Sequence, residues 1–237
     1  MGRYTTSVET SGSFPAQPVA QQNYAQPYGQ PSYGNPYGQP LQQAPSNWPT
    51  FFPKPVIGLE REGVIIEDIG QQINSPGQIT VIPGSLEAIK MMRLKGYKVV
   101  IITDQPGILK GKASPQQVDS TNQYLMQVFS QAGTLSIEGL LYSTSDLKDD
   151  MYAKPNTGMF KRAETEFGAG INWSEGWYVG HNLKDALAAE KIGSKPVILK
   201  TGNGEKTLRG MENAGNKKLK DKVLVFNNLL EFAESLD

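Results

Sequence analysis

The sequence predicts an α/β protein with a Rossmann-like, doubly wound parallel sheet, preceded by an N-terminal arm. From residue 54 onward, short apolar runs alternate with amphipathic stretches, which is the pattern of strands joined by helical crossovers. Glycines at positions 96, 133, 170 and 193 follow the amphipathic stretches, as helix C-caps do. The start of the chain lacks this alternation. We therefore expect an arm at residues 1–52 and an α/β domain at residues 53–237.

Six strands and five helices are expected in the α/β domain. The strands are short apolar runs, expected at residues 56–59, 98–103, 139–143, 176–179, 196–200 and 222–226. The helices have apolar residues at helical spacing and are expected at residues 85–95, 115–132, 156–167, 183–192 and 228–236. In the first helix these apolar residues are Leu86, Ile89, Met92 and Leu94; in the second they are Val118, Tyr124, Leu125 and Phe129. Right-handed crossovers then place a ligand crevice at the C-terminal ends of the strands.

The arm is of low complexity. Residues 1–50 carry only Arg3 and Glu9 as charged side chains, and the unit Tyr-Gly-(Gln/Asn)-Pro recurs between residues 26 and 40. Proline at this frequency removes backbone donors and opposes both helix and sheet. Two interpretations stay open: a disordered spacer, or an arm whose Tyr rings dock on a protein partner. Trp48, Phe51 and Phe52 are expected to pin the end of the arm onto the domain.

Composition excludes several classes of function. Lys+Arg and Asp+Glu are equal at 23 each and the sequence pI is about 6.6, so we expect no nucleic-acid partner. The chain has no Cys and one His, which excludes disulfides, a thiolate nucleophile and a multi-His metal site. No apolar run approaches the ~20 residues that a membrane span needs, and we expect a cytoplasmic protein.

Polar residues follow four of the expected strands, at the edge where the crevice should lie. They are Glu60 and Glu62, then Thr103, then Lys154, and finally His181 with Asp185. In this order they resemble the four motifs of the haloacid dehalogenase superfamily. Residues 81–88, 103–111, 154–159 and 200–205 are more narrowly similar to its heptose-bisphosphate and histidinol-phosphate phosphatase branch. The resemblance covers nearly everything from Pro55 to the end.

The resemblance implies a role for each of these positions. Glu60 lies at the position of the aspartate nucleophile, and Glu62 at that of the general acid and base. Thr103 and Lys154 match the residues that bind the transferring phosphoryl group. The Mg²⁺ of the family would be held at Glu60, at the backbone carbonyl of Glu62 and at His181, with Asp185 as a secondary ligand.

Several of these positions depart from the family. Glu60 and Glu62 are one methylene longer than Asp, and a misplacement of about 1 Å can cost ~10²-fold in rate. His181 replaces an Asp ligand, and Mg²⁺ has little use for imidazole. Asp104 replaces an Asn and adds negative charge where a phosphate should bind. Residues 143–153 lack both the zinc ligands and the Arg of the heptose-bisphosphate branch.

These departures favour a catalytically degenerate pseudoenzyme, a phosphatase-like domain that serves as a structural or protein-interaction component of a larger assembly. We then expect no cofactor. Thr103 would cap a turn, and Lys154 would pair with Glu60 or Glu62 in place of the metal's charge. One alternative is an active Mg²⁺-dependent phosphomonoesterase of the sugar-bisphosphate type with an adapted glutamate-based site. Another is a protein that binds a small phosphorylated ligand through Thr103 and Lys154 without hydrolysis.

Overall fold

The computed structural model describes residues 55–134, 136–168, 170–212 and 216–237. The arm predicted at residues 1–52, its three aromatic anchors and the boundary at residue 53 lie outside the described residues. Among the helices that are described, none has the length and apolar character needed to cross a bilayer.

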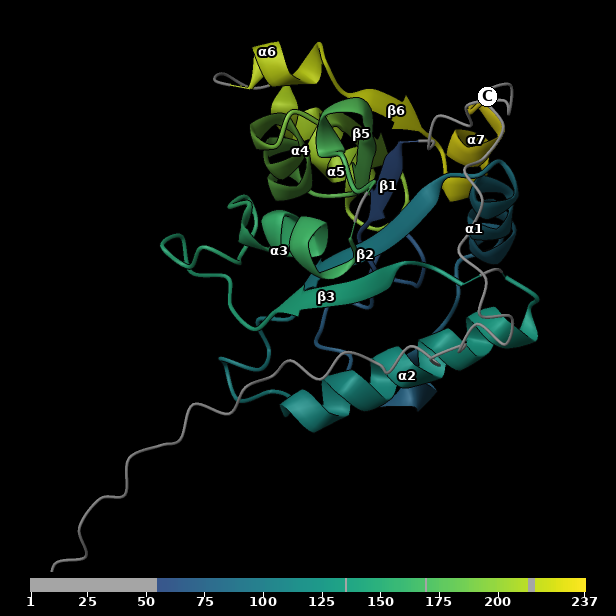
Figure 1. Ribbon diagram of the computed structural model, residues 1–237. Helices are drawn as coiled ribbons and strands as arrows, with labels where there is room; N and C mark the ends of the chain where they lie inside the picture. The colour runs from purple at the N-terminus through teal and green to yellow at the C-terminus, as the bar shows by residue number, and fades with distance from the viewer. Residues whose placement is uncertain (1–54, 135, 169, 213–215) are drawn as a thin grey trace, which may run out of the picture. The chain divides into compact units, whose positions relative to one another are not determined.

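A parallel sheet of six strands forms the centre of the domain, and the strand order is β3-β2-β1-β4-β5-β6 (Figure 1). The strands are β1 Val56–Leu59, β2 Lys98–Asp104, β3 Gly139–Ser143, β4 Trp177–Gly180, β5 Lys195–Leu199 and β6 Leu224–Phe226. β1 pairs with both β2 and β4, so the direction in which the chain adds strands reverses on either side of β1. This is the doubly wound topology that the sequence predicts, with each strand within two residues of its expected bounds.

Helices follow the strands on both faces of the sheet (Figure 1). They are α1 Ser85–Leu94, α2 Pro115–Gln131, α3 Gly158–Glu166, α4 Leu183–Lys191, α5 Gly204–Met211, α6 Lys217–Lys220 and α7 Leu229–Glu234, with 3-10 turns at Pro76–Gln78 and Trp173–Glu175. α5 and α6 were not predicted from the sequence. They bury little besides Met211 and Leu219, so a periodic apolar stripe is nearly absent from them.

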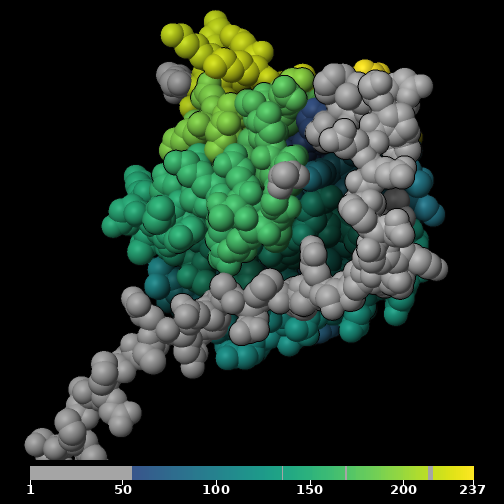
Figure 2. All heavy atoms as spheres, in the orientation of Figure 1, coloured from purple at the N-terminus to yellow at the C-terminus, as the bar shows by residue number. Residues whose placement is uncertain are grey.

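The alternation of side chains along each strand divides the core into two layers. Ile57 and Leu59 of β1 pack with α1, α2 and α7, whereas Val56 belongs to the cluster on the opposite face. That second cluster includes Phe160 of α3 together with Trp173 and Tyr178, whose rings meet edge to face. A smaller cluster joins α4, β5, α5 and α6. Figure 2 shows the surface of the domain from the same side as Figure 1.

Two of the apolar residues that were placed at helical spacing lie at the surface. Leu94 is 68% exposed and Tyr124 is 40% exposed. α1 turns its Ala88, Ile89 and Met92 face toward the sheet, and Leu94 at its last turn points away from that face. Simple apolar spacing therefore overestimated the width of the buried stripe on α1 and α2.

Candidate functional site

The predicted site residues converge at the C-terminal edge of the sheet. Glu60 directly follows β1, Thr103 is the second-last residue of β2, and His181 directly follows β4. Lys154 comes from the loop between β3 and α3, and Asp185 from the first turn of α4. Because β1 lies between β2 and β4, these segments meet around Glu60.

Lys154 forms the centre of this site. Its Nζ donates to Glu60 Oε2, to Asp185 Oδ1 at 2.7 Å and to the hydroxyl of Tyr178 at 2.8 Å. Burial lowers the pKa of Lys154 to about 8, with Asp185 acting in the opposite direction. The Lys154 side chain therefore still carries its charge at neutral pH.

Tyr178 couples the lysine to the core of the sheet. Its hydroxyl donates to the carbonyl of Ile102 at 2.6 Å and lies 3.2 Å from Glu60 Oε2. The ring is fully buried, and burial raises the pKa of Tyr178 well above its ordinary value. The phenol is therefore a fixed hydrogen-bonding group that holds the side chains of Lys154 and Glu60 in place.

Thr103 bridges the two glutamates. Its hydroxyl is within hydrogen-bonding distance of Glu60 Oε1 and lies 3.1 Å from Glu62 Oε2. The amide of Gln105 donates to both oxygens of Glu62, at 3.0 and 3.2 Å. Thr103 thus serves the site directly, and the expected turn-capping bond is not among its described contacts.

Lys154 pairs with Glu60, one of the two acids expected for it, and Arg61 is the cation beside Glu62. The guanidinium is fully buried and bonds Glu62 Oε1 and the side-chain oxygen of Asn122 in α2. Burial acts to raise the pKa of Glu62, but Arg61 and then Gln105 outweigh it and lower that pKa. Glu62 is therefore held in its ionised form.

Asp104 does not add an uncompensated charge to the site. Lys184 of α4 donates to Asp104 Oδ2 at 2.6 Å, and the backbone N–H of Lys154 donates to Oδ1 at 3.3 Å. Burial raises the pKa of Asp104 to about 6, against the lowering effect of Lys184. The expected repulsion of a phosphate is thus offset by a cation that lies at the rim, where Lys184 is 35% exposed.

His181 faces the neighbouring loop. Its Nδ1 accepts the backbone N–H of Asn203 at 2.9 Å, and its Nε2 lies 2.8 Å from Asn182 Nδ2. A Cβ at Gly63 or Gly202 would come within 2.6 or 2.5 Å of Nδ1, so the ring is tightly enclosed. Burial lowers the pKa of His181 and favours the neutral imidazole.

Asp185 anchors the start of α4. Its Oδ2 accepts the backbone N–H groups of His181 at 3.1 Å and Asn182 at 2.9 Å, while its Oδ1 accepts from Lys154. Burial acts to raise the pKa of Asp185, but Lys154 outweighs it and the pKa falls to about 2. Every oxygen of this carboxylate is thus committed within the protein.

These residues do not fit a divalent cation as they are arranged. The Lys154 ammonium lies between the carboxylates of Glu60 and Asp185, and Nδ1 of His181 accepts a backbone N–H. Throughout the described part of the chain, no group of three or more His, Asp or Glu residues is placed to hold a metal. The family's Mg²⁺ site is therefore not preserved in this geometry.

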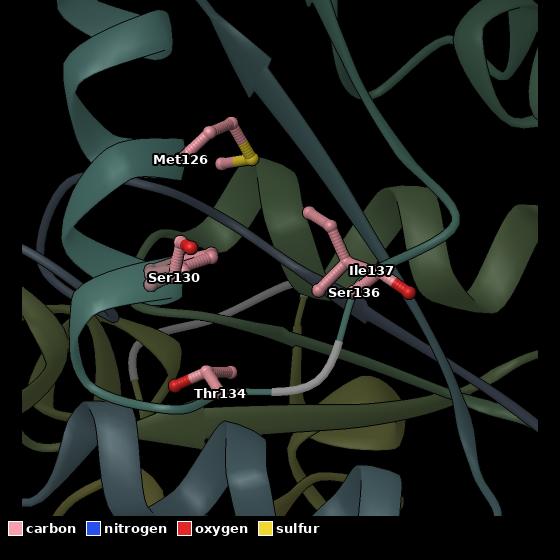
Figure 3. A pocket seen from close by; sticks show the side chains of 6 residues that line it. Met126, Ser130, Thr134, Ser136 and Ile137 are labelled. Atoms are coloured by element: carbon pink, nitrogen blue, oxygen red, sulfur yellow. The ribbon is translucent and has the colours of Figure 1, made fainter. Parts of the chain in front are cut away.

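A hollow of about 300 Å³ lies elsewhere, between the second half of α2 and the segment that enters β3. Figure 3 shows Met126 and Ser130 on the helix, Ser136 and Ile137 across from them, and Thr134 where the chain leaves the helix. Its lining carries no acid, base or histidine. The polar cluster around Lys154, rather than this hollow, is the candidate active site.

Comparison with known proteins places this geometry in a family. The sequence model of the polynucleotide kinase 3 phosphatase family matches residues 73–224. A D-glycero-beta-D-manno-heptose-1,7-bisphosphate 7-phosphatase of Neisseria meningitidis is 30% identical over 180 residues, which is 76% of this chain and 92% of the relative. The chain belongs to the haloacid dehalogenase superfamily. Within it, the chain falls in the heptose-bisphosphate phosphatase-like branch, as the motifs predict.

Solved structures agree with this family assignment. The heptose 1,7-bisphosphate phosphatase of B. bronchiseptica, described as complexed with magnesium and phosphate, is 27% identical with a TM-score of 0.66 over 76% of this chain and 96% of that one. The corresponding enzyme of Burkholderia thailandensis is 26% identical with a TM-score of 0.56. A Pseudomonas aeruginosa relative, 29% identical over 75% of this chain and 95% of its own, is also named a heptose-bisphosphate 7-phosphatase.

These relatives correct the expectation of a catalytically silent pseudoenzyme. That expectation is wrong, because haloacid dehalogenase relatives that match three quarters of the chain are named as phosphatases. It took the substitutions at Glu60, Glu62 and His181 together as the loss of the site. In the structure, Arg61, Gln105 and Lys184 supply partners for Glu62 and Asp104.

Sequence reasoning missed four members of the site: Arg61, Gln105, Tyr178 and Lys184. Arg61 lies between Glu60 and Glu62, and Gln105 lies two residues after Thr103, so a charged or amide residue next to a motif position could have signalled them. Tyr178 lies in an apolar strand and Lys184 on an amphipathic helix, where nothing local distinguishes them from core and surface residues.

Proposed function

We propose that this chain is an active phosphomonoesterase of the haloacid dehalogenase type that acts on a phosphorylated sugar through a glutamate-based site. The observation that carries the proposal is the environment of Glu60. This buried carboxylate occupies the family's nucleophile position and accepts from the hydroxyl of Thr103 and the ammonium of Lys154. A carboxylate held in one orientation next to a cation is suited to in-line attack on phosphorus.

The proposed reaction has two steps. Glu62, which is ionised in the resting site, first takes up a proton from solvent. A Glu60 oxygen attacks the phosphorus of the monoester, the bond from phosphorus to the sugar oxygen breaks, and Glu62 gives its proton to that oxygen. Water then attacks the phosphorus of the glutamyl phosphate while Glu62 takes its proton. Phosphate leaves, Glu60 is again a carboxylate, and Glu62 returns its proton to solvent. Arg61 favours the ionised form of Glu62. The resting site therefore already holds the base that the second step needs.

The substrate class rests on the relatives' names, which specify heptose-1,7-bisphosphate. The loop at residues 143–153 lacks the zinc ligands and the Arg expected of that branch. The proposal therefore stops at a sugar phosphate or bisphosphate. Lys184, half-buried at the rim beside Lys154, is the cation best placed to meet phosphoryl oxygens as they enter.

Phosphate release by the purified full chain tests the proposal. The substrates are an aryl phosphate, heptose-1,7-bisphosphate and, because the matching family model carries that name, an oligonucleotide 3′-phosphate. We expect release from the sugar bisphosphate, and a loss of about 10³-fold or more in Glu60→Gln. Glu164→Gln, an exposed acid on α3, is the matched control. No release from any substrate, or equal release by Glu60→Gln, would contradict the proposal.

A further inference from the structure

The two innermost carboxylates of the site are balanced by a side chain of the protein itself. Lys154 Nζ lies between Glu60 Oε2 and Asp185 Oδ1, and the three side chains are 0%, 7% and 1% exposed, respectively. A divalent ion that bridged these carboxylates would have to enter the volume that the ammonium fills. At such separations two cations repel strongly when water is excluded.

The position next to this pair offers no replacement ligand. Nδ1 of His181 accepts the N–H of Asn203, and the glycines at 63 and 202 enclose the ring so closely that it has little room to turn. The side chain of Glu62 is bonded to Arg61 and Gln105. Mg²⁺ requires about six oxygens in octahedral order, and here each nearby carboxylate already has a partner.

Building on the proposed phosphatase function, we propose that Lys154 is the resident cation of this site and that the chain hydrolyses phosphomonoesters without a divalent metal. The ammonium orients the Glu60 carboxylate and offsets charge on the phosphoryl group during attack and release. Neither step of the proposed reaction needs an electron donor or a second substrate besides water. In this respect the chain would differ from its B. bronchiseptica relative, which is described with magnesium and phosphate bound.

Metal binding is measured first, because it needs no activity. The full chain, stripped with a chelator, is titrated with Mn²⁺ as a paramagnetic substitute for Mg²⁺, and free Mn²⁺ is followed by electron paramagnetic resonance. We expect no saturable uptake up to about 1 mM. Uptake of one equivalent that disappears in Asp185→Asn would overturn the proposal.

The second measurement asks whether Lys154 is the group that excludes the metal. Lys154→Met combined with His181→Asp frees two carboxylates and adds a third, so this double variant should gain saturable Mn²⁺ binding. Lys161→Met with His181→Asp, which changes an exposed lysine of α3, should not. Near-ultraviolet circular dichroism verifies folding. If the folded double variant gains nothing, the assignment to Lys154 is wrong; if it fails to fold, the wild-type titration decides.

Hydrolysis is measured last, with chelator and with Mg²⁺. Rates that agree within about twofold support the proposal. Hydrolysis that is lost in chelator and restored by Mg²⁺ overturns it while leaving the phosphatase function intact. Absence of hydrolysis in both conditions overturns the phosphatase function, and the Mn²⁺ titration then still decides whether Lys154 excludes a metal.

Discussion

At the residue scale, the site is defined by which cation meets which carboxylate. Lys154 meets Glu60 and Asp185, Arg61 meets Glu62, and Lys184 meets Asp104. Buried carboxylates without such partners would pay a large desolvation cost. This many acids can therefore lie at one edge of the sheet only if each has a cation partner. The same pairing explains why substitutions that would each destabilise the site alone are tolerated together.

Asp104 should make the stability of the fold depend on pH. Its folded-state pKa is about 6 against an ordinary 3.8, so the folded form holds the proton more tightly than the unfolded form. The stability that this supplies is present below pH 3.8 and is lost as pH rises through about 6. Asp104→Asn removes this dependence. We expect its free energy of unfolding, relative to wild type, to rise by about 2 kcal/mol between pH 4 and pH 7.5.

Urea unfolding at several pH values measures that difference. Asp146→Asn is the matched control, since Asp146 is an exposed partner of Lys110 and its pKa is lowered. A difference between Asp104→Asn and wild type that stays constant, or that falls as pH rises, would show that Asp104 is not held protonated by burial.

At the element scale, β2 and α4 are tied together across the entrance of the site. The link is the pair between Asp104, the last residue of β2, and Lys184, the second residue of α4. The pair is half-buried, so its contribution lies between that of a surface ion pair and that of a fully buried one.

A double-mutant cycle tests this link. At pH 7.5, Lys184→Met should lower the free energy of unfolding by about 1–2 kcal/mol, because it leaves Asp104 buried and ionised without its cation. Adding Asp104→Asn should restore most of the loss. If the changes in the free energy of unfolding caused by the two substitutions simply add in the double variant, the pair does not couple β2 to α4.

The β1 strand has its own steric requirement. A Cβ at Gly58 would lie 2.6 Å from Cδ2 of Tyr178 and 2.8 Å from Trp173, both of them buried rings. Gly58→Ala should therefore cost about 1–3 kcal/mol of stability through overpacking. It should also lower phosphatase activity, because the displaced ring is the one whose hydroxyl holds Lys154.

Two open glycines provide controls for that substitution. A Cβ at Gly77 or Gly210 meets nothing within 4 Å. Gly77→Ala should be nearly neutral, and Gly210→Ala, inside α5, should stabilise by up to about 1 kcal/mol. Thermal unfolding of the three variants checks the order, and a Gly58→Ala protein as stable as Gly77→Ala would contradict the packing argument.

At the scale of the whole domain, stability should be graded from the centre of the sheet to its β6 edge. β1 is buried along its length and paired on both sides, whereas Leu224 and Val225 of β6 are each 43% exposed. Native-state hydrogen exchange should show the slowest amides in β1, β2 and β4 and the fastest strand amides in β6. Equal protection of β6 and β1 would indicate that the sheet opens only as a unit.

The arm at residues 1–52 stays a predicted contact for a protein partner. Its Tyr rings are the groups that would supply binding energy. Co-purification from a source lysate, compared between the full chain and a variant with Tyr28, Tyr33 and Tyr37 changed to Ser, tests this. Loss of a specific partner in the variant is the expected result, and identical partners in both would show that these rings do not bind it.

The six strands, their alternation with the main helices and the four loops that carry the site could be predicted from the sequence alone. These depend on local periodicity and on motif spacing, which are written in consecutive residues. The sequence alone could not show which side chains pair with one another in the site. Lys184 and Asp104 are far apart in the chain, as are Tyr178 and Lys154, and each pair meets only because the strand order sets β1 between β2 and β4. Those contacts decide whether a carboxylate in this site is destabilising or functional. Its desolvation and its charge partners depend on the residues that surround it in the folded protein.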